Sequence, residues 1–147
     1  MSVQKADNIK AAIQCNDVQT AIGLIDEFLA SGFNVDSPLP YNPKGFENNW
    51  SLIFWASLCQ TDEILRCIVE KHRGNVNVRD SSGYTPLLLC AFHGKFQCVK
   101  YLVEHGADIN ARSNFGESLE ELVLRKPQTS DKDLELREYV QKLIRNT

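Results

Sequence analysis

The chain has 147 residues, of which 43% are hydrophobic and 24% are charged, and its formal net charge is −3. A chain of this length and composition is typical of one globular domain with a single core. The small negative charge and the absence of a run of lysines and arginines argue against nucleic acid or an anionic membrane as the main partner.

The first predicted unit covers residues 1–36 and has two helices. The second helix carries apolar residues three and four positions apart, which places them on one face; they are Val18, Ala21, Ile22, Ile25, Phe28 and Leu29. From Asn16 to the glycine that ends this helix, Gly32, is sixteen positions, against twelve from Gly94 to Gly106 in a later unit. We therefore expect this helix to be about one turn longer than its later counterpart.

The second predicted unit, residues 37–79, opens with a long connecting segment at residues 37–49, which we call the long finger. Three prolines within six residues restrict its backbone to extended or turn conformations, which lowers the entropy lost on meeting a partner. The finger is therefore either a specificity loop or a tolerated, mobile insertion. As a specificity loop it would present the apolar side chains of Leu39, Tyr41 and Phe46.

The helices of the second unit align with those of the third at an offset of 34, which places Trp50 against Tyr84. Further along, Val76 aligns with Ile109 at an offset of 33. One extra residue is therefore expected around residues 71–74, and we predict that it lies in a turn.

The third predicted unit, residues 80–112, has the clearest local signals. Thr85 can cap the free N–H groups of a helix start, and Pro86 at the first helical position has no N–H to leave unpaired. This helix ends before Gly94 and is too short to be stable alone. A second helix from Lys95 carries an apolar face, and Gly106 suits the left-handed residue that ends helices.

The fourth predicted unit, residues 113–147, begins its first helix at Ser118, which has capping-box spacing to Glu121. The last helix would carry Leu136, Tyr139, Val140, Leu143 and Ile144.

Gly83 and Gly116 are 33 positions apart, and each unit reads as turn, short helix, short helix and return segment. This pattern resembles the ankyrin repeat. The resemblance implies an all-α solenoid of about four stacked helix-turn-helix units with β-turn fingers, forming one domain over residues 1–147; an unrelated helical bundle is the alternative. Polar outer faces are expected at the ends of the stack: Lys5, Asp7, Lys10 and Gln14 on the first helix, and Glu135, Arg137, Glu138, Lys142 and Arg145 on the last.

In ankyrin proteins the fingers and first helices line a concave binding face. The resemblance transfers the partner-binding positions of this face to Glu47, Asn48, Trp50, Leu58, Ser81, Ser82, Tyr84, Phe92, His93, Asn114, Phe115 and Glu117. To these we add Leu39, Tyr41 and Phe46 of the long finger. We expect the rings of Trp50, Tyr84, Phe92 and Phe115 to be exposed together as interface anchors. The alternative is that each ring folds down onto the neighbouring repeat.

The chain departs from the family at the histidine that usually follows Thr-Pro-Leu and bridges fingers by hydrogen bonds. The corresponding residues are Phe54, Leu88 and Glu120. We therefore expect weaker polar ties between repeats, with apolar contact in their place. Asn110 lies at the return-turn asparagine that is β-hydroxylated in some family members, so its hydroxylation is a side hypothesis.

Five cysteines, an odd number, argue against a disulfide framework, and we interpret Cys15, Cys59, Cys67, Cys90 and Cys98 as small buried residues. With the three histidines they could form a metal site or a nucleophile. However, the sequence has no Cys-x-x-Cys pair, no histidine pair at ligand spacing, no glycine-rich phosphate loop and no serine hydrolase motif. We expect no metal, no cofactor and no catalytic residues.

The resemblance implies a non-catalytic protein-interaction module, either an adaptor or a stoichiometric inhibitor, that binds a peptide or a globular domain. We expect it to be a monomer by itself. No apolar run is long enough for a membrane helix or a secretory signal, so we expect it in the cytoplasm or the nucleus. The alternatives are an ankyrin fragment of a larger scaffold or regulatory protein and, more remotely, an enzyme, whose sign would be a pocket with perturbed ionisable groups.

Overall fold

The computed structural model describes residues 2–39, 50–59, 61–125, 127 and 129–146. Within these residues it has α-helices, one π-helical turn (η1) and a single isolated β-bridge between Arg112 and Ser118. The elements are α1 (Ser2–Gln14), α2 (Val18–Ala30), α3 (Leu52–Ala56), α4 (Glu63–Arg66), η1 (Cys67–Lys71), α5 (Pro86–Phe92), α6 (Phe96–Glu104), α7 (Leu119–Arg125) and α8 (Asp131–Arg145). The predicted all-α class is confirmed.

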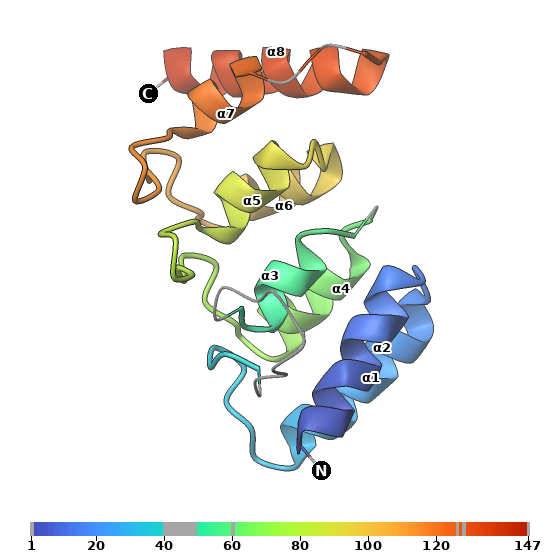
Figure 1. The fold of residues 1–147 in the computed structure, drawn as a ribbon. Coiled ribbons are helices and arrows are strands. Elements are labelled where there is room, and N and C mark those ends of the chain that lie inside the picture. The colour runs from blue at the N-terminus through green and yellow to red at the C-terminus, as the bar shows by residue number, and fades with distance from the viewer. Residues whose placement is uncertain (1, 40–49, 60, 126, 128, 147) are drawn as a thin grey trace.

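The helices form pairs that stack from α1 and α2 at one end to α7 and α8 at the other, and the connecting fingers project from one side (Figure 1). The first helices α1, α3, α5 and α7 contact one another in sequence, and so do the second helices α2 and α4, and α6 and α8. The core lies between these two layers. No pair can bury its apolar residues alone, which is why each depends on its neighbours.

Helix α5 begins as the sequence predicts. Thr85 Oγ1 accepts a hydrogen bond from the Leu88 N–H at 3.3 Å, and Pro86 is the first helical residue. All residues from Pro86 to Ala91 are buried, so this helix of about two turns is stabilised by packing rather than by its own propensity.

The predicted extra turn in the first unit is confirmed. Helix α2 has 13 residues and its counterpart α6 has 9, a difference of about one turn. At the other end of the chain, Ser130 caps α8 by accepting the N–H of Asp133, and Leu136 and Val140 are its buried residues.

The expectation of a wholly polar outer face on α1 is wrong at Lys10. Its side chain is buried, and its ammonium lies 5.4 Å from the centre of the Trp55 ring and 3.8 Å from Asp7 Oδ1. The aliphatic stem of a lysine can cover apolar surface while its charge finds a ring face or a carboxylate. Lys10 therefore contributes to the packing between α1 and α3.

The extra residue of the second unit lies in a helix, which corrects the predicted turn. In the π-helical turn η1 the His72 N–H donates to the carbonyl of Cys67, five residues back, at 3.2 Å. In α6 the equivalent His105 N–H donates to Tyr101, four residues back, at 3.1 Å. A π-helical turn takes up one residue without breaking the helix.

Gly83 allows adjacent fingers to approach closely. Its φ is +77°, and a Cβ on it would lie 2.7 Å from the backbone N of Asn114 and even closer to the Asn114 Oδ1. Gly116 has the same φ of +77°, but no atom lies within 4 Å of the corresponding Cβ position. The two glycines therefore share a backbone conformation and differ in their surroundings.

This difference gives a test of finger contact. Gly116→Ala should lower the free energy of unfolding by about 1–2 kcal/mol, the cost of a left-handed alanine. Gly83→Ala should cost roughly 1–3 kcal/mol more, because the added methyl also displaces the neighbouring finger. Urea unfolding of both variants measures the difference, and equal losses would contradict the close approach.

Candidate functional site

A buried carboxylate, Asp80, organises the fingers. Its Oδ1 accepts hydrogen bonds from the N–H groups of Ser82 and Tyr84, each at 2.9 Å, which closes the turn that contains Gly83. Its Oδ2 accepts the indole N–H of Trp50, on the preceding finger, also at 2.9 Å. Asp80 thus shapes one finger and ties it to the next.

Ser113 repeats this role 33 residues later. Its hydroxyl oxygen accepts the N–H groups of Phe115 and Glu117, at 3.2 and 3.3 Å. Tyr84, which aligns with Trp50, donates its hydroxyl to the carboxylate of Glu117, four residues after Ser113. The fingers that contain Asp80 and Glu117 therefore each hold a ring of the finger before them.

The rings of Trp50 and Tyr84 consequently fold down onto the neighbouring repeat, and the expectation that they would be fully exposed is not met. Trp50 is half-buried, stacked on Phe54 at 6.0 Å between centroids and edge-on to Trp55 at 5.1 Å. Tyr84 is also half-buried, and burial together with the Glu117 carboxylate raises its pKa to about 12.

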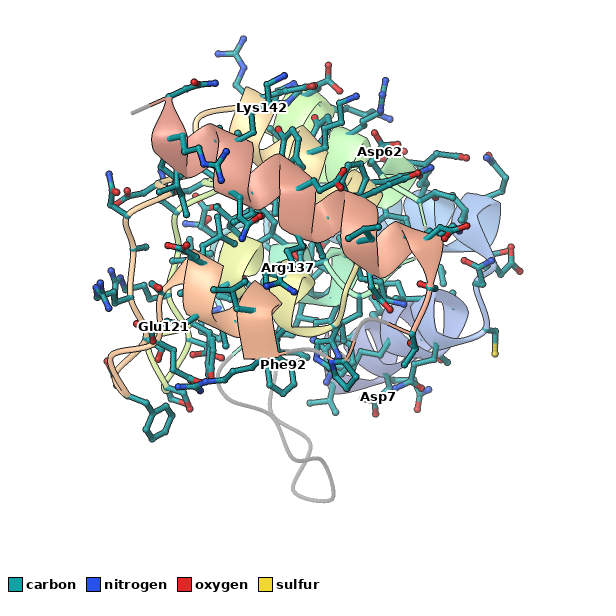
Figure 2. The ribbon with its side chains drawn as sticks, turned by 90° about the horizontal axis from the view of Figure 1, so that it is seen from above. Asp7, Asp62, Phe92, Glu121, Arg137 and Lys142 are labelled. Carbon is teal, nitrogen blue, oxygen red and sulfur yellow. The ribbon has the colours of Figure 1, made fainter. Side chains whose placement is uncertain are left out.

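Phe92 and Phe115 are exposed as predicted. The Phe92 side chain, on the last residue of α5, is 51% exposed, and that of Phe115, at a finger tip, is 73% exposed. Figure 2 shows Phe92 and Asp7 along the side of the first helices, with Asp62 and Lys142 on the opposite side. The Phe115 ring lies 6.5 Å from that of Tyr84.

Two shallow hollows meet at Phe92. One of about 240 Å³ is lined by Phe92, Glu117, Leu122, Arg125 and Pro127. The other, of about 120 Å³, is lined by Trp50, Asp80, Tyr84, Leu89, Phe92 and His93. We call these two hollows together with Phe115 the Phe92 face.

Several other predicted positions have structural roles. Leu39 is buried, and its N–H donates to the carbonyl of Trp50 at 3.0 Å. The carbonyls of Ser81 and Ser82 accept the side-chain amide and the backbone N–H of Asn114, at 3.3 and 2.9 Å. These contacts join fingers, although Ser81 and Asn114 remain exposed.

The remaining predicted positions lie away from the Phe92 face or outside the described residues. Leu58 is half-buried and lines a separate hollow of about 260 Å³ with residues of α1. Asn110 is exposed, and its N–H donates to Asp108 Oδ1 at 2.9 Å. The positions outside the described residues are Tyr41, Phe46, Glu47 and Asn48.

Polar ties between repeats come from the fingers, since Phe54, Leu88 and Glu120 stand in place of the helical histidine. Asn77 accepts the N–H of Asp108 at 2.8 Å and donates to the carbonyl of Gly106 at 3.2 Å. Arg79 donates to the carbonyl of Arg112 at 2.9 Å. Phe54 and Leu88 are both buried, so the expected apolar contact is present as well.

The sequence reasoning missed Asp80, Leu122, Arg125 and Pro127. Asp80 and Ser113 both stand three residues before a glycine, a turn signal that could have been recognised. Arg125 lies in the degenerate last unit, where no repeat position pointed to it; it donates to Glu117 Oε2 at 2.7 Å.

Cys59, Cys67, Cys90 and Cys98 are buried as expected, whereas Cys15 is exposed, which corrects its interpretation as a buried residue. Within the described part of the chain, a possible metal-ligand set does occur: Asp26, Cys67 and His72 offer atoms that all lie within 4.8 Å of one another. Hydrogen bonds from Lys71 and His72 lower the pKa of Asp26. Burial and the Asp26 charge raise the pKa of Cys67 to about 11.

Stacked helix pairs with fingers on one side define a helical repeat protein. A family model of ankyrin repeats, in three copies, matches residues 9–113. The chain belongs to the ankyrin-repeat family. None of the described helices combines the length and apolar character that crossing a membrane requires.

Similar proteins match over parts of their length. Ankyrin repeat domain-containing protein 29 of Homo sapiens is 40% identical over 57 residues, 39% of this chain and 19% of that protein. The serine/threonine-protein kinase VIK of Arabidopsis thaliana is 33% identical over 91 residues, 60% of this chain and 21% of the kinase. Alpha-latrocrustotoxin-Lt1a of Latrodectus tredecimguttatus is 36% identical over 62 residues, 42% of this chain and 4% of the toxin. The matches thus cover about a fifth or less of these relatives.

The Tyr84 hydrogen bond predicts a pH-dependent stability. Because folding raises the pKa of Tyr84 from 10.0 to about 12, its contribution is complete below pH 10 and is lost as the pH rises toward 12. Tyr84→Phe should therefore unfold about 1 kcal/mol more easily at pH 8, and the gap to the wild type should narrow above pH 10. Denaturant unfolding at several pH values measures it; a gap that does not change with pH would contradict this assignment.

Proposed function

We propose that this chain is a non-catalytic protein-interaction module that binds its partner through the Phe92 face. The observation that carries the proposal is the exposure of Phe92 and Phe115, at 51% and 73%, beside two hollows with partly apolar walls. Large rings left in solvent next to a pocket are characteristic anchors of protein interfaces. Ankyrin repeats are generally protein-interaction modules, which supports the same class.

The chemistry of the face fits a peptide or globular domain that inserts an apolar side chain beside Phe92. Leu122 and Pro127 would contact such a side chain, while Arg125 and Glu117 border the same hollow with charges of opposite sign. The hydrogen-bonded fingers hold this surface in place before binding, so little ordering entropy is lost. The exposed Ser81 and Asn114, His93, and Tyr41, Phe46, Glu47 and Asn48 of the long finger would extend the contact.

We further propose that the chain acts as an adaptor or a stoichiometric inhibitor. It would be a monomer by itself and would be located in the cytoplasm or the nucleus. A repeat segment of a larger scaffold or regulatory protein is the second candidate, because the matched relatives are mostly much longer than this chain.

Hydroxylation of Asn110 fits its exposure; mass spectrometry of its peptide from an oxygenated eukaryotic host would show the added oxygen or rule it out.

Replacing the exposed rings should abolish binding without unfolding the protein. We expect Phe92→Ala with Phe115→Ala to reduce partner recovery at least about tenfold, since anchor residues typically contribute more than about 1.4 kcal/mol. Quantitative mass spectrometry of proteins captured by the tagged chain measures this. The matched control is Leu134→Ala, another exposed apolar residue, on α8 and lining neither hollow.

Two outcomes decide the proposal. Partners that are lost from the double variant but retained by Leu134→Ala would support binding at the Phe92 face. Partners retained equally by the wild type, the double variant and the control would exclude this face. Circular dichroism of each variant verifies that the helices are intact.

A further inference from the structure

A cysteine, a histidine and a carboxylate meet on the second-helix layer, away from the Phe92 face. Asp26, on α2, has its Oδ1 2.7 Å from His72 Nε2 and 3.6 Å from Cys67 Sγ. Lys71 Nζ holds the other oxygen, Oδ2, at 2.7 Å. Three different ligand types thus converge from two neighbouring repeats.

The π-helical turn creates this convergence. In a regular α-helix, two residues five positions apart point about 140° away from each other. In η1 the backbone bond from His72 N to Cys67 O closes the wider turn, so both side chains reach the same carboxylate. At the equivalent place in α6, Tyr101 stands where Cys67 does, and the His105 ring stacks on it at 3.9 Å. The extra residue and the cysteine therefore distinguish this repeat from the third.

We propose that Asp26, Cys67 and His72 form a binding site for a divalent transition metal of the zinc type. Thiolate, imidazole and carboxylate are the ligands that Zn²⁺ takes in proteins, and three of them with water complete a tetrahedron. Cys67 is 8% exposed, while the side chains of His72 and Asp26 are 19% and 31% exposed. Solvent can therefore supply the fourth ligand.

The three ligand atoms lie within 4.8 Å of one another, and two of their separations can be compared with those of tetrahedral zinc. Tetrahedral zinc places a sulfur about 3.6 Å from an oxygen or nitrogen ligand, and two such lighter ligands about 3.3 Å apart. The Cys67 Sγ to Asp26 Oδ1 distance of 3.6 Å already fits, and His72 would move outward by about 0.6 Å from 2.7 Å. The ion would replace the thiol proton and the Nε2 proton that His72 donates to Asp26, so that the imidazole binds as its Nδ1–H tautomer. Lys71 would remain a second-shell partner that orients the carboxylate through Oδ2.

The competing account is that the three residues only tie α2 to η1 by hydrogen bonds. Both accounts predict that Asp26→Asn weakens the fold, so stability alone does not separate them. Metal binding separates them, because hydrogen bonding requires no ion. A bound ion would also raise the unfolding midpoint of the wild type, and a chelator would reverse the rise.

The test is a titration of the reduced full chain with Co²⁺ and then Zn²⁺. We expect equimolar Co²⁺ to give a sulfur-to-cobalt charge-transfer absorption that Zn²⁺ abolishes. Cys67→Ser and His72→Gln should each lower Zn²⁺ affinity by at least about 100-fold. Cys15→Ser and His105→Gln, which change the exposed cysteine and the equivalent histidine of the next repeat, are the matched controls and should bind as the wild type does.

A readout on the wild type keeps the test decisive if a variant fails to fold. Zinc should shift the imidazole nitrogen resonances of His72 and leave those of His93 and His105 unchanged. Absence of the charge-transfer band, or a zinc response at His105 instead of His72, would overturn the site. Because these measurements do not involve the Phe92 face, their outcome is independent of the proposed protein interaction.

Discussion

The arrangement of the fingers depends on one buried carboxylate. Asp80 accepts two backbone N–H groups of its own turn and the indole N–H of Trp50 from the finger before it. A buried carboxylate is tolerated only when such donors surround it. Its hydrogen bonds therefore fix the finger's conformation and its position against its neighbour together, and Ser113 repeats the turn at the next finger.

The proposed binding surface is related to this constraint. Because Trp50 and Tyr84 are used to hold the stack, Phe92 and Phe115 are the aromatic residues left to solvent on the described part of the face. The inferred metal site lies on the other layer and joins α2 to the second repeat through Asp26. The two proposals thus assign partner recognition to one side of the chain and reinforcement of a repeat junction to the other.

The periodic part of the fold could be predicted from the sequence, and the irregular part could not. The start of α5 could be predicted because Thr85 and Pro86 are local signals. The greater length of α2 could be predicted because the span from Asn16 to Gly32 is longer than its later counterpart. The prediction that the extra residue lies in a turn was wrong, because counting residues locates an insertion but does not show which hydrogen bond accommodates it. The exposure of a ring also depends on residues far away in the sequence. Exposure was predicted for both Phe92 and Trp50, but Asp80, 30 residues after Trp50, accepts its indole N–H, and Trp50 is half-buried.

The most direct test of this account is the free energy of unfolding of Asp80→Ala and Asp80→Ser, measured by urea titration. Alanine leaves three donors unpaired and should cost about 3 kcal/mol or more. Serine can close the turn as Ser113 does but cannot also reach Trp50, so its loss should be intermediate. Unfolding free energies within about 0.5 kcal/mol of the wild type for both variants would contradict the claim that Asp80 holds the fingers together.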